Sequence, residues 1–173
     1  MKIFIDTSFF LEEMKSSLVT PEYVRWFKDP EIIKYSDNQY RSFSLEGQIE
    51  YVESCLNSND VLLAGIFHES LHIVNICING ITSVHKRAEI TYVIGNKAYW
   101  GRGLATKSIK RIIQYLREEY DLHKLCAGLS SLNVGSKKAL EKNNFCLEGV
   151  RKKHLYYNNE WSDCLEYGLI LDD

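Results

Sequence analysis

The part of the chain that most constrains its fold is residues 88–114, where a short apolar segment, a glycine-bearing turn and an amphipathic segment follow one another. Residues 89–94 are rich in β-branched and aromatic side chains, which is typical of a strand. After the turn, apolar side chains recur at the spacing of one helical face: Leu104, Ala105, Ile109, Ile112, Ile113, Leu116 and Tyr120. The stretch therefore predicts a strand, a turn and a helix in direct succession.

The turn carries two glycines, Gly101 and Gly103, directly before the helix. Glycine lets a ligand approach the backbone, and the first turn of a helix offers free N–H groups and a positive dipole end. Together these properties predict an anion-binding site, most simply for the pyrophosphate of a nucleotide-bearing cofactor.

Two common nucleotide motifs fit this turn poorly. Residues 101–108 nearly spell a P-loop, but Thr106 stands where a second glycine must let the backbone wrap phosphate, and no acidic strand end for Mg²⁺ is evident. A dinucleotide-binding fingerprint needs an acidic residue closing the next strand, and residues 123–129 offer none.

A third pattern fits better. Trp100-Gly101-Arg102-Gly103-Leu104-Ala105 resembles the acetyl-CoA loop of the GNAT N-acetyltransferases, although Trp100 stands where Gln or Arg is usual. The lead-in Tyr99-Trp100-Gly101 is similar to the RimJ/RimL-like branch. A second block, Asn133-Val134-Gly135-Ser136 followed by residues 140–145, resembles that family's Asn-x-x-Ser helix ending in Gly-Phe. The resemblance covers residues 88 to about 163.

The resemblance implies a mixed α/β (α+β) fold. We expect one mixed, mostly antiparallel, twisted sheet of about six or seven strands with about four helices and a splayed central parallel strand pair. Patterning predicts strands at 2–5, 61–67, 72–78, 89–94, 123–128, 145–151 and 164–171. Helices are predicted from Thr20, from Ser44 to about 56, and over 104–119 and 134–143, with a short turn of helix at 31–35. We expect one domain spanning residues 1–173.

In the resembling family, the pantetheine arm of acetyl-CoA pairs with the strand before the glycine turn. The resemblance thus implies that acetyl-CoA is the cosubstrate and that a backbone N–H near Val93 or Ile94 polarises the thioester carbonyl. Arg102 is the side chain expected to meet its phosphates. The implied cofactor-binding residues are Tyr92, Val93, Ile94, Trp100, Gly101, Arg102, Gly103, Leu104, Ala105, Thr106, Asn133 and Ser136.

Two residues are candidates for the chemistry. Glu89 lies on the strand before the turn, at the spacing where histone acetyltransferases of the resembling superfamily place a general base. The alternative role of Glu89 is that of a solvated strand acid or one paired with Lys86 or Arg87. Ser136 is the family-matched proton donor to the thiolate, while Asn133 and Ser136 could instead only cap a helix. His154 is a further candidate base, although a lone histidine is more often a surface residue.

The acceptor is expected to be a primary amine on a small molecule, with amino sugars and sugar nucleotides first. A sugar nucleotide favours a closed pocket with aromatic side chains and a cationic contact, for which Arg41, Arg151, Lys152, Lys153 and Tyr156 are available. The basic run at 151–153 favours this class, because it would attract a phosphorylated acceptor. The alternatives are the N-terminal amine of a protein, as in ribosomal-protein acetylation, and a domain that binds acyl-CoA or a partner without turnover.

Composition excludes other function classes. With 21 basic and 23 acidic residues, the chain lacks the broad basic face of a nucleic-acid binder. No signal peptide or membrane span is evident, so we expect a cytoplasmic protein without membrane or nucleic-acid partners, and the sequence leaves a homodimer open. The five cysteines and five histidines show no ligand spacing, so buried free thiols and no metal are expected.

Overall fold

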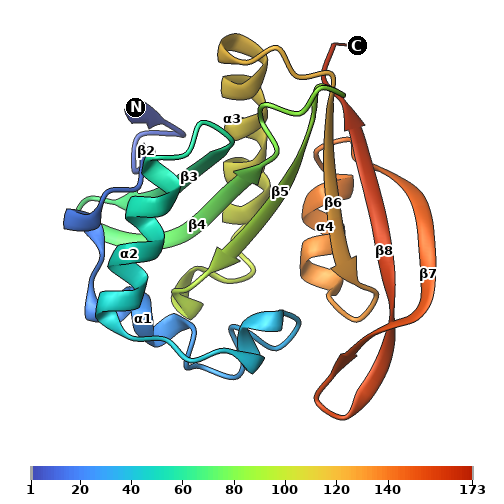
Figure 1. Ribbon diagram of the computed structural model, residues 1–173, viewed down its shortest axis with the longest axis horizontal. Coiled ribbons are helices and arrows are strands. Elements are labelled where there is room, and N and C mark those ends of the chain that lie inside the picture. Colours follow the sequence, from blue (N-terminus) through green and yellow to red (C-terminus); the bar gives the residue numbers. More distant parts are fainter. Residues whose placement is uncertain (1, 173) are drawn as a thin grey trace.

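The computed structural model describes residues 2–172 and contains one sheet of eight strands with four α-helices (Figure 1). The strands lie in the order β1-β2-β3-β4-β5-β6-β8-β7. The elements are β1 (Lys2–Phe4), β2 (Phe9–Glu13), α1 (Pro21–Trp26), α2 (Leu45–Leu56), β3 (Val61–His68), β4 (Leu71–Asn79), β5 (Arg87–Ile94), α3 (Leu104–Glu119), β6 (Lys124–Ser130), α4 (Val134–Glu141), β7 (Cys146–Tyr157) and β8 (Glu160–Ile170). Short 3₁₀ turns η1 (Ser16–Leu18), η2 (Asp37–Tyr40) and η3 (Lys97–Tyr99) lie between them.

Side-chain caps fix where three of the helices begin. Thr20 accepts a hydrogen bond from the Tyr23 amide, Ser44 from the Gly47 amide, and Asn133 from the Ser136 amide. Each cap satisfies one backbone N–H that the first helical turn leaves unpaired. The predicted starts of α1 and α2 are confirmed.

The parallel pair at the centre of the sheet is short. β5 pairs with β6 only where Arg87–Glu89 lie opposite Lys124–Cys126, and beyond that point the two strands have no paired residues. All other neighbours in the sheet are antiparallel. The expected splayed parallel pair is therefore present.

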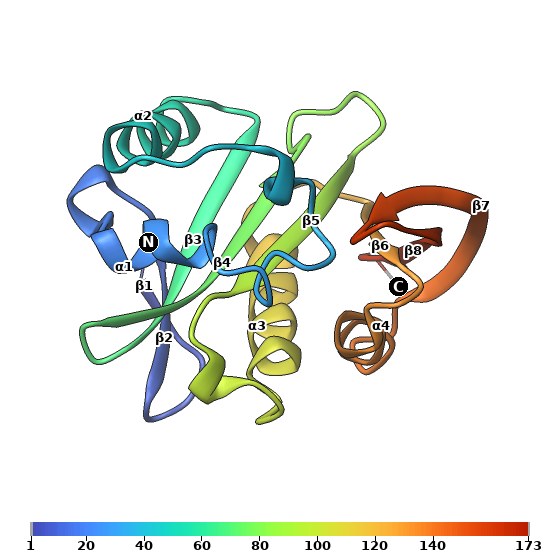
Figure 2. The ribbon, with the colours of Figure 1, turned by 90° about the horizontal axis from the view of Figure 1, so that it is seen from below.

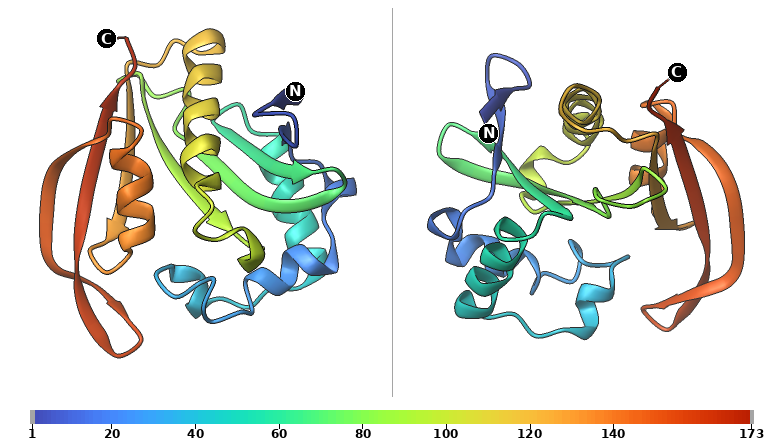
Figure 3. Two further views of the ribbon diagram at one scale, coloured as in Figure 1. Left: turned by 180° about the vertical axis from the view of Figure 1, so that it is seen from behind. Right: turned by 45° about the horizontal axis from the view of Figure 1, so that its top comes forward.

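Helices cover the sheet on both faces. α3 and α4 lie on one face, and α1 and α2 lie on the other (Figure 2). The larger core contains Ile109, Ile112 and Leu116 of α3 packed with strand residues, and the smaller contains Tyr23 and Trp26 of α1. Seen from behind, α3 lies alongside β4 and β5, while α4 lies alongside β6 and β8 (Figure 3). The two halves of the molecule thus diverge where β5 leaves β6.

The structure corrects three expectations about the elements. The sheet has eight strands because β2 pairs with β3, and the charged ends Glu12 and Glu13 hid this short strand in the sequence. No helix forms at 31–35, where the chain makes turns before η2. The last two strands are longer than expected and form a hairpin whose tip is at Asn158 and Asn159.

In the described part of the chain, no helix combines the length and the apolar character needed to cross a bilayer.

Candidate functional site

A cavity of about 1280 Å³ lies where β5 and β6 separate. It is lined on one side of the sheet by the first turn of α3 and by α4, and on the other by α1, α2 and the segment 27–44 that joins them. β5 contributes five consecutive residues, 90–94, and β6 contributes 127–129. Since consecutive strand residues point to opposite faces, the cavity passes through the sheet.

The glycine turn forms one end of this cavity. Gly101 and Gly103 have φ of 71° and 74°, in the left-handed region that favours glycine, and both line the cavity. A Cβ built on either residue would meet no atom within 4 Å, so the backbone here borders open space. This is the arrangement that lets a ligand reach the main chain.

The helix that follows has an uncovered N-terminus. Gly103 is the N-cap of α3, so no side chain caps the helix, and its first turn holds no acidic residue. The other three α-helices of the described chain carry caps. The N–H groups at the start of α3 are therefore available to an anion, and the 16-residue helix adds its dipole. A pyrophosphate fits these residues.

Trp100 connects the glycine turn to the end of β5 by a hydrogen bond. Its indole Nε1 donates a hydrogen bond of 3.0 Å to the carbonyl of Ile94, and its ring lines the cavity. On the preceding η3 turn, Lys97 binds Asp29 at 2.8 Å and Glu31 at 2.6 Å. The glycine turn is thus tied both to the strand before it and to the segment between α1 and α2.

The direction of the β5 amides decides which of them faces the gap. The Gly95 amide bonds to the Ile73 carbonyl of β4, and amides in an antiparallel pair alternate in direction. The Val93 amide therefore points to β4, while those of Tyr92 and Ile94 point toward the gap. Of the two amides expected to polarise the thioester carbonyl, only that of Ile94 has the required direction.

Ser136 and Tyr92 meet on the α4 side of the cavity. The Tyr92 hydroxyl donates to the Ser136 carbonyl at 3.4 Å, and both residues line the cavity. Burial raises the pKa of Tyr92, so its hydroxyl keeps its proton. Asn133 caps α4 through its side chain and also lines the cavity, so its expected capping role is compatible with a role at the site.

Glu89 lies apart from these groups. It is exposed, sits where β5 still pairs with β6, and is absent from the cavity lining. Its alternative partner Lys86 is engaged by Asp121 at 2.6 Å. The assignment of Glu89 as a base remains a prediction, and any proton it takes would have to arrive through water.

The wall on the α1 and α2 side contains a buried polar chain. Gln48 Nε2 donates to the Tyr23 hydroxyl at 2.9 Å, and the Asn75 amide contacts the same hydroxyl. Asn75 is buried, and its Oδ1 has no hydrogen-bond partner among the described residues. All three line the cavity and were missed from the sequence, although an asparagine inside the apolar run 73–78 was a signal.

The charged residues of the lining are mostly basic. They are Glu31, Lys34, Arg41, Lys138 and Lys142. Glu31 is already bound to Lys97, and none of the four basic side chains has a carboxylate within 4 Å among the described residues. The cavity wall is therefore cationic.

Two basic residues near the glycine turn lie outside the cavity lining. The Arg102 guanidinium lies 5.9 Å from the centre of the Tyr99 ring and outside the lining, so its contact with the phosphates remains a prediction. Lys107 is bound to Asp6 at 2.8 Å. Lys138 and Lys142 of the α4 side do line the cavity.

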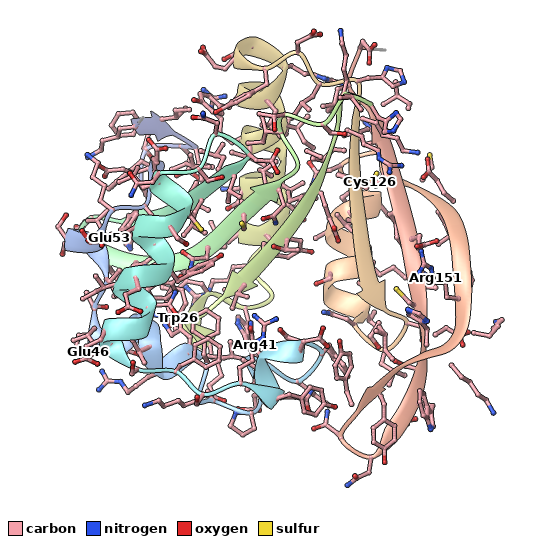
Figure 4. All side chains as sticks on the ribbon, viewed as in Figure 1. Trp26, Arg41, Glu46, Glu53, Cys126 and Arg151 are labelled. Atoms are coloured by element: carbon pink, nitrogen blue, oxygen red, sulfur yellow. The ribbon has the colours of Figure 1, made fainter. Side chains whose placement is uncertain are left out.

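The run 151–153 does not face the cavity, which corrects the expectation that it attracts the acceptor. Arg151 pairs with Glu166 and Lys152 with Asp163, and the Lys153 amide donates to the same Asp163 carboxylate. Figure 4 shows Arg151 on the far side of β6 from the gap, and His154 is likewise absent from the lining. Sequence alone could not show that two acids on β8 pair with Arg151 and Lys152.

No group of three or more His, Cys, Asp or Glu side chains among residues 2–172 is arranged to hold a metal ion.

Comparison with known proteins agrees with this geometry. Solved structures that resemble this chain include RimL, a ribosomal L7/L12 α-N-protein acetyltransferase in complex with coenzyme A (TM-score 0.88, 21% identity, 99% of each chain covered). They also include a spermidine N-acetyltransferase from Vibrio cholerae in complex with CoA and spermine (TM-score 0.82, 17% identity, 96% of this chain and 98% of that chain). At these identities the likeness establishes the fold.

Sequence relatives carry the same family description. The chain is 35% identical over 68 residues to the probable N-acetyltransferase YjcK of Bacillus subtilis and 28% identical over 107 residues to the putative ribosomal N-acetyltransferase YdaF of the same organism. These matches span 39% and 62% of this chain, and only 38% and 58% of those two proteins. The family model described as "Acetyltransferase (GNAT) domain" matches residues 10–146. This chain belongs to the GNAT acetyltransferase domain family.

Proposed function

We propose that residues 1–173 act as one acetyl-CoA-dependent N-acetyltransferase domain that moves an acetyl group to a primary amine. The observation that carries the proposal is a cavity that joins an uncapped helix N-terminus to a gap between two parallel strands. In it, the pyrophosphate would bind at Gly101–Thr106 and the pantetheine arm would lie along β5. Lys138 and Lys142 would attract the remaining phosphate charge.

The reaction needs three groups in order. The amine nitrogen attacks the thioester carbonyl carbon, the carbonyl oxygen takes up negative charge, and the C–S bond then breaks to release the thiolate. The Ile94 amide, which points into the gap, would stabilise the oxyanion. Ser136 would protonate the thiolate, while the proton lost by the amine goes to water or, through water, to Glu89.

The lining constrains the acceptor because it holds no free carboxylate to act as base. At pH 7, an α-amino group of pKa about 7.7–8.0 is neutral in roughly one molecule in ten, whereas an alkylamine of pKa about 10.4 is neutral in fewer than about one in a thousand. The cationic wall lowers the amine pKa further. We therefore favour an acceptor amine of low pKa.

Two acceptor classes meet this requirement. The N-terminal α-amine of a protein is favoured by the names of YdaF and RimL, to which the chain is similar. An amino sugar, whose amine pKa is lowered by neighbouring oxygens, is favoured by the cationic lining. A polyamine fits poorly, since its second ammonium group would meet Lys34 and Arg41.

Release of free thiol from acetyl-CoA, measured against a panel of peptides, amino sugars and spermidine, tests the proposal. We expect turnover with peptides or amino sugars to exceed turnover with spermidine. Binding of acetyl-CoA without turnover on any amine would instead indicate a non-catalytic acyl-CoA-binding domain.

The same assay separates the two candidate catalytic residues. Ser136→Ala should lower kcat while leaving the Kd of acetyl-CoA unchanged, because the hydroxyl acts only when the thiolate departs.

Glu89→Gln should lower the rate mainly at low pH, where more of the amine is protonated, and the loss should shrink as pH rises. Wild-type profiles in Glu89→Gln would make Glu89 a solvated strand residue.

A further inference from the structure

We propose that Arg41, assisted by Lys34, binds an anionic group on the acceptor, so that the preferred substrate carries a carboxylate or phosphate beside its primary amine. This inference rests on the proposed acetyltransferase function. It identifies the chemical class of the acceptor and assigns a specificity-determining residue to it.

Arg41 lies on the acceptor side of the sheet. It follows η2, precedes α2 and lines the cavity. Figure 2 shows α2 on the face of the sheet opposite α3 and α4. Figure 4 shows its side chain at the open end of the space between β5 and β6. The glycine turn and Lys138 and Lys142 serve the cofactor end, so Arg41 remains for the second substrate.

The backbone that carries these two cations is held in place. Asn158 Nδ2 donates to the Lys34 carbonyl at 3.0 Å, and the Tyr157 hydroxyl donates to Asp37 at 2.8 Å. The Tyr40 hydroxyl donates to the Tyr156 carbonyl. These three contacts fasten segment 27–44 to the tip of the β7–β8 hairpin, so its cationic side chains project from a fixed wall.

Every acid of segment 27–44 already has a partner. Asp29 and Glu31 bind Lys97, and Asp37 accepts the hydrogen bond from Tyr157. Arg41 and Lys34 are left without a carboxylate partner among the described residues. Lys34 and Arg41 are therefore the charged side chains of this segment that line the cavity without an ionic partner, and an anion is the group that would pair with them.

Arginine offers a planar fork of donors that matches a carboxylate or a phosphate in two hydrogen bonds. Losing such a contact to a charged group weakens binding by about 10- to 100-fold. The effect should appear in KM for the acceptor and not in the Kd of acetyl-CoA, because Arg41 lies away from the glycine turn.

The test compares matched acceptor pairs. One pair is glucosamine and glucosamine 6-phosphate, and the other is two short peptides with free N-termini, in which acidic second and third residues are replaced by their amides. kcat and KM are measured for the wild type, Arg41→Gln and Arg41→Lys. The control is Arg25→Gln, which removes an exposed arginine on α1 that pairs with Glu22 outside the cavity.

We expect the wild type to prefer the anionic member of at least one pair by about tenfold or more. Arg41→Gln should abolish this preference by raising KM for the anionic member alone, Arg41→Lys should retain part of it, and Arg25→Gln should behave as wild type. The pair that shows the effect identifies the source of the anion.

A preference that survives in Arg41→Gln, or an uncharged acceptor that is used equally well, would overturn the inference while leaving the acetyltransferase function standing. If no acceptor turns over, the proposed function fails. Calorimetric titration of the same acceptors onto the CoA-saturated protein still decides the role of Arg41: equal binding of both members of each pair overturns it.

Discussion

At the scale of single residues, the cofactor end of the site depends on two backbone conformations. Gly101 and Gly103 lie in the left-handed region beside open space, and Gly103 leaves α3 without a side-chain cap. A capping Ser, Thr or Asp would stabilise the helix by about 1 kcal/mol, yet it would also occupy the N–H groups that an anion needs. The helix start is thus left open at the one place where a ligand must approach.

Gly103→Asn tests this reading. Asparagine tolerates a positive φ, so the fold should be retained, while the new side chain fills the space above the helix start. We expect the Kd of acetyl-CoA, measured by calorimetry, to rise by about tenfold or more. Gly80→Asn is the matched control, because Gly80 has a φ of 81° and lies outside the cavity lining. Equal affinities in both variants would contradict the cofactor assignment.

At the scale of elements, β5 and the residue after it make three different contacts with the rest of the site. Its first residues pair with β6, its last amide faces the gap, and Gly95 directly after it packs against α1. The Gly95 backbone lies so close to Trp26 that a Cβ there would sit 1.7 Å from the indole ring. This contact sets how near α1 can lie to the end of β5, and so fixes one wall of the cavity.

Gly95→Ala should therefore destabilise the protein. The Trp26 ring is buried and stands where the new Cβ would lie, so overpacking should reduce the free energy of unfolding by about 3 kcal/mol in a denaturant titration. Gly128→Ala on β6 is the control, since its Cβ would meet only Cys164 Sγ at 3.9 Å. If both variants unfold at the wild-type midpoint, the packing of α1 does not limit this position.

The same elements show how far sequence patterns reach. Local signals predicted the helix starts at Thr20 and Ser44, the glycine turn and the span of α3, because the residues that determine each are close in the chain. The acceptor wall could not be predicted in this way. The sequence offers Arg41 and the run 151–153 as cations for the acceptor, but Arg41 lines the cavity while Arg151 and Lys152 are paired with acids, and contacts between segments far apart in sequence decide this.

At the scale of the whole molecule, the two halves of the sheet share only a short parallel pairing. They are also held together by the larger core and by the contacts between segment 27–44 and the β7–β8 hairpin. A buried histidine, His72, packs against the smaller core beneath α1 and α2, and the centre of its ring lies 4.6 Å from that of Trp26 and 4.8 Å from that of Phe67. Its titration links stability to pH.

Burial lowers the pKa of His72 to about 4, well below its ordinary value of about 6.5 in an unfolded chain. Because the folded protein holds this ring neutral, its contribution to stability is complete above pH 6.5. As pH falls from 6.5 to 4, the unfolded chain binds a proton that the folded protein does not, so the free energy of unfolding should drop by about 3 kcal/mol.

Denaturant titrations across this range test the role of His72. In His72→Gln, the free energy of unfolding should change less steeply with pH. His85→Gln, which removes an exposed histidine, should keep the wild-type slope. An unchanged slope in His72→Gln would show that the ring charges within the folded core, which would require a carboxylate or water at its unpaired Nδ1.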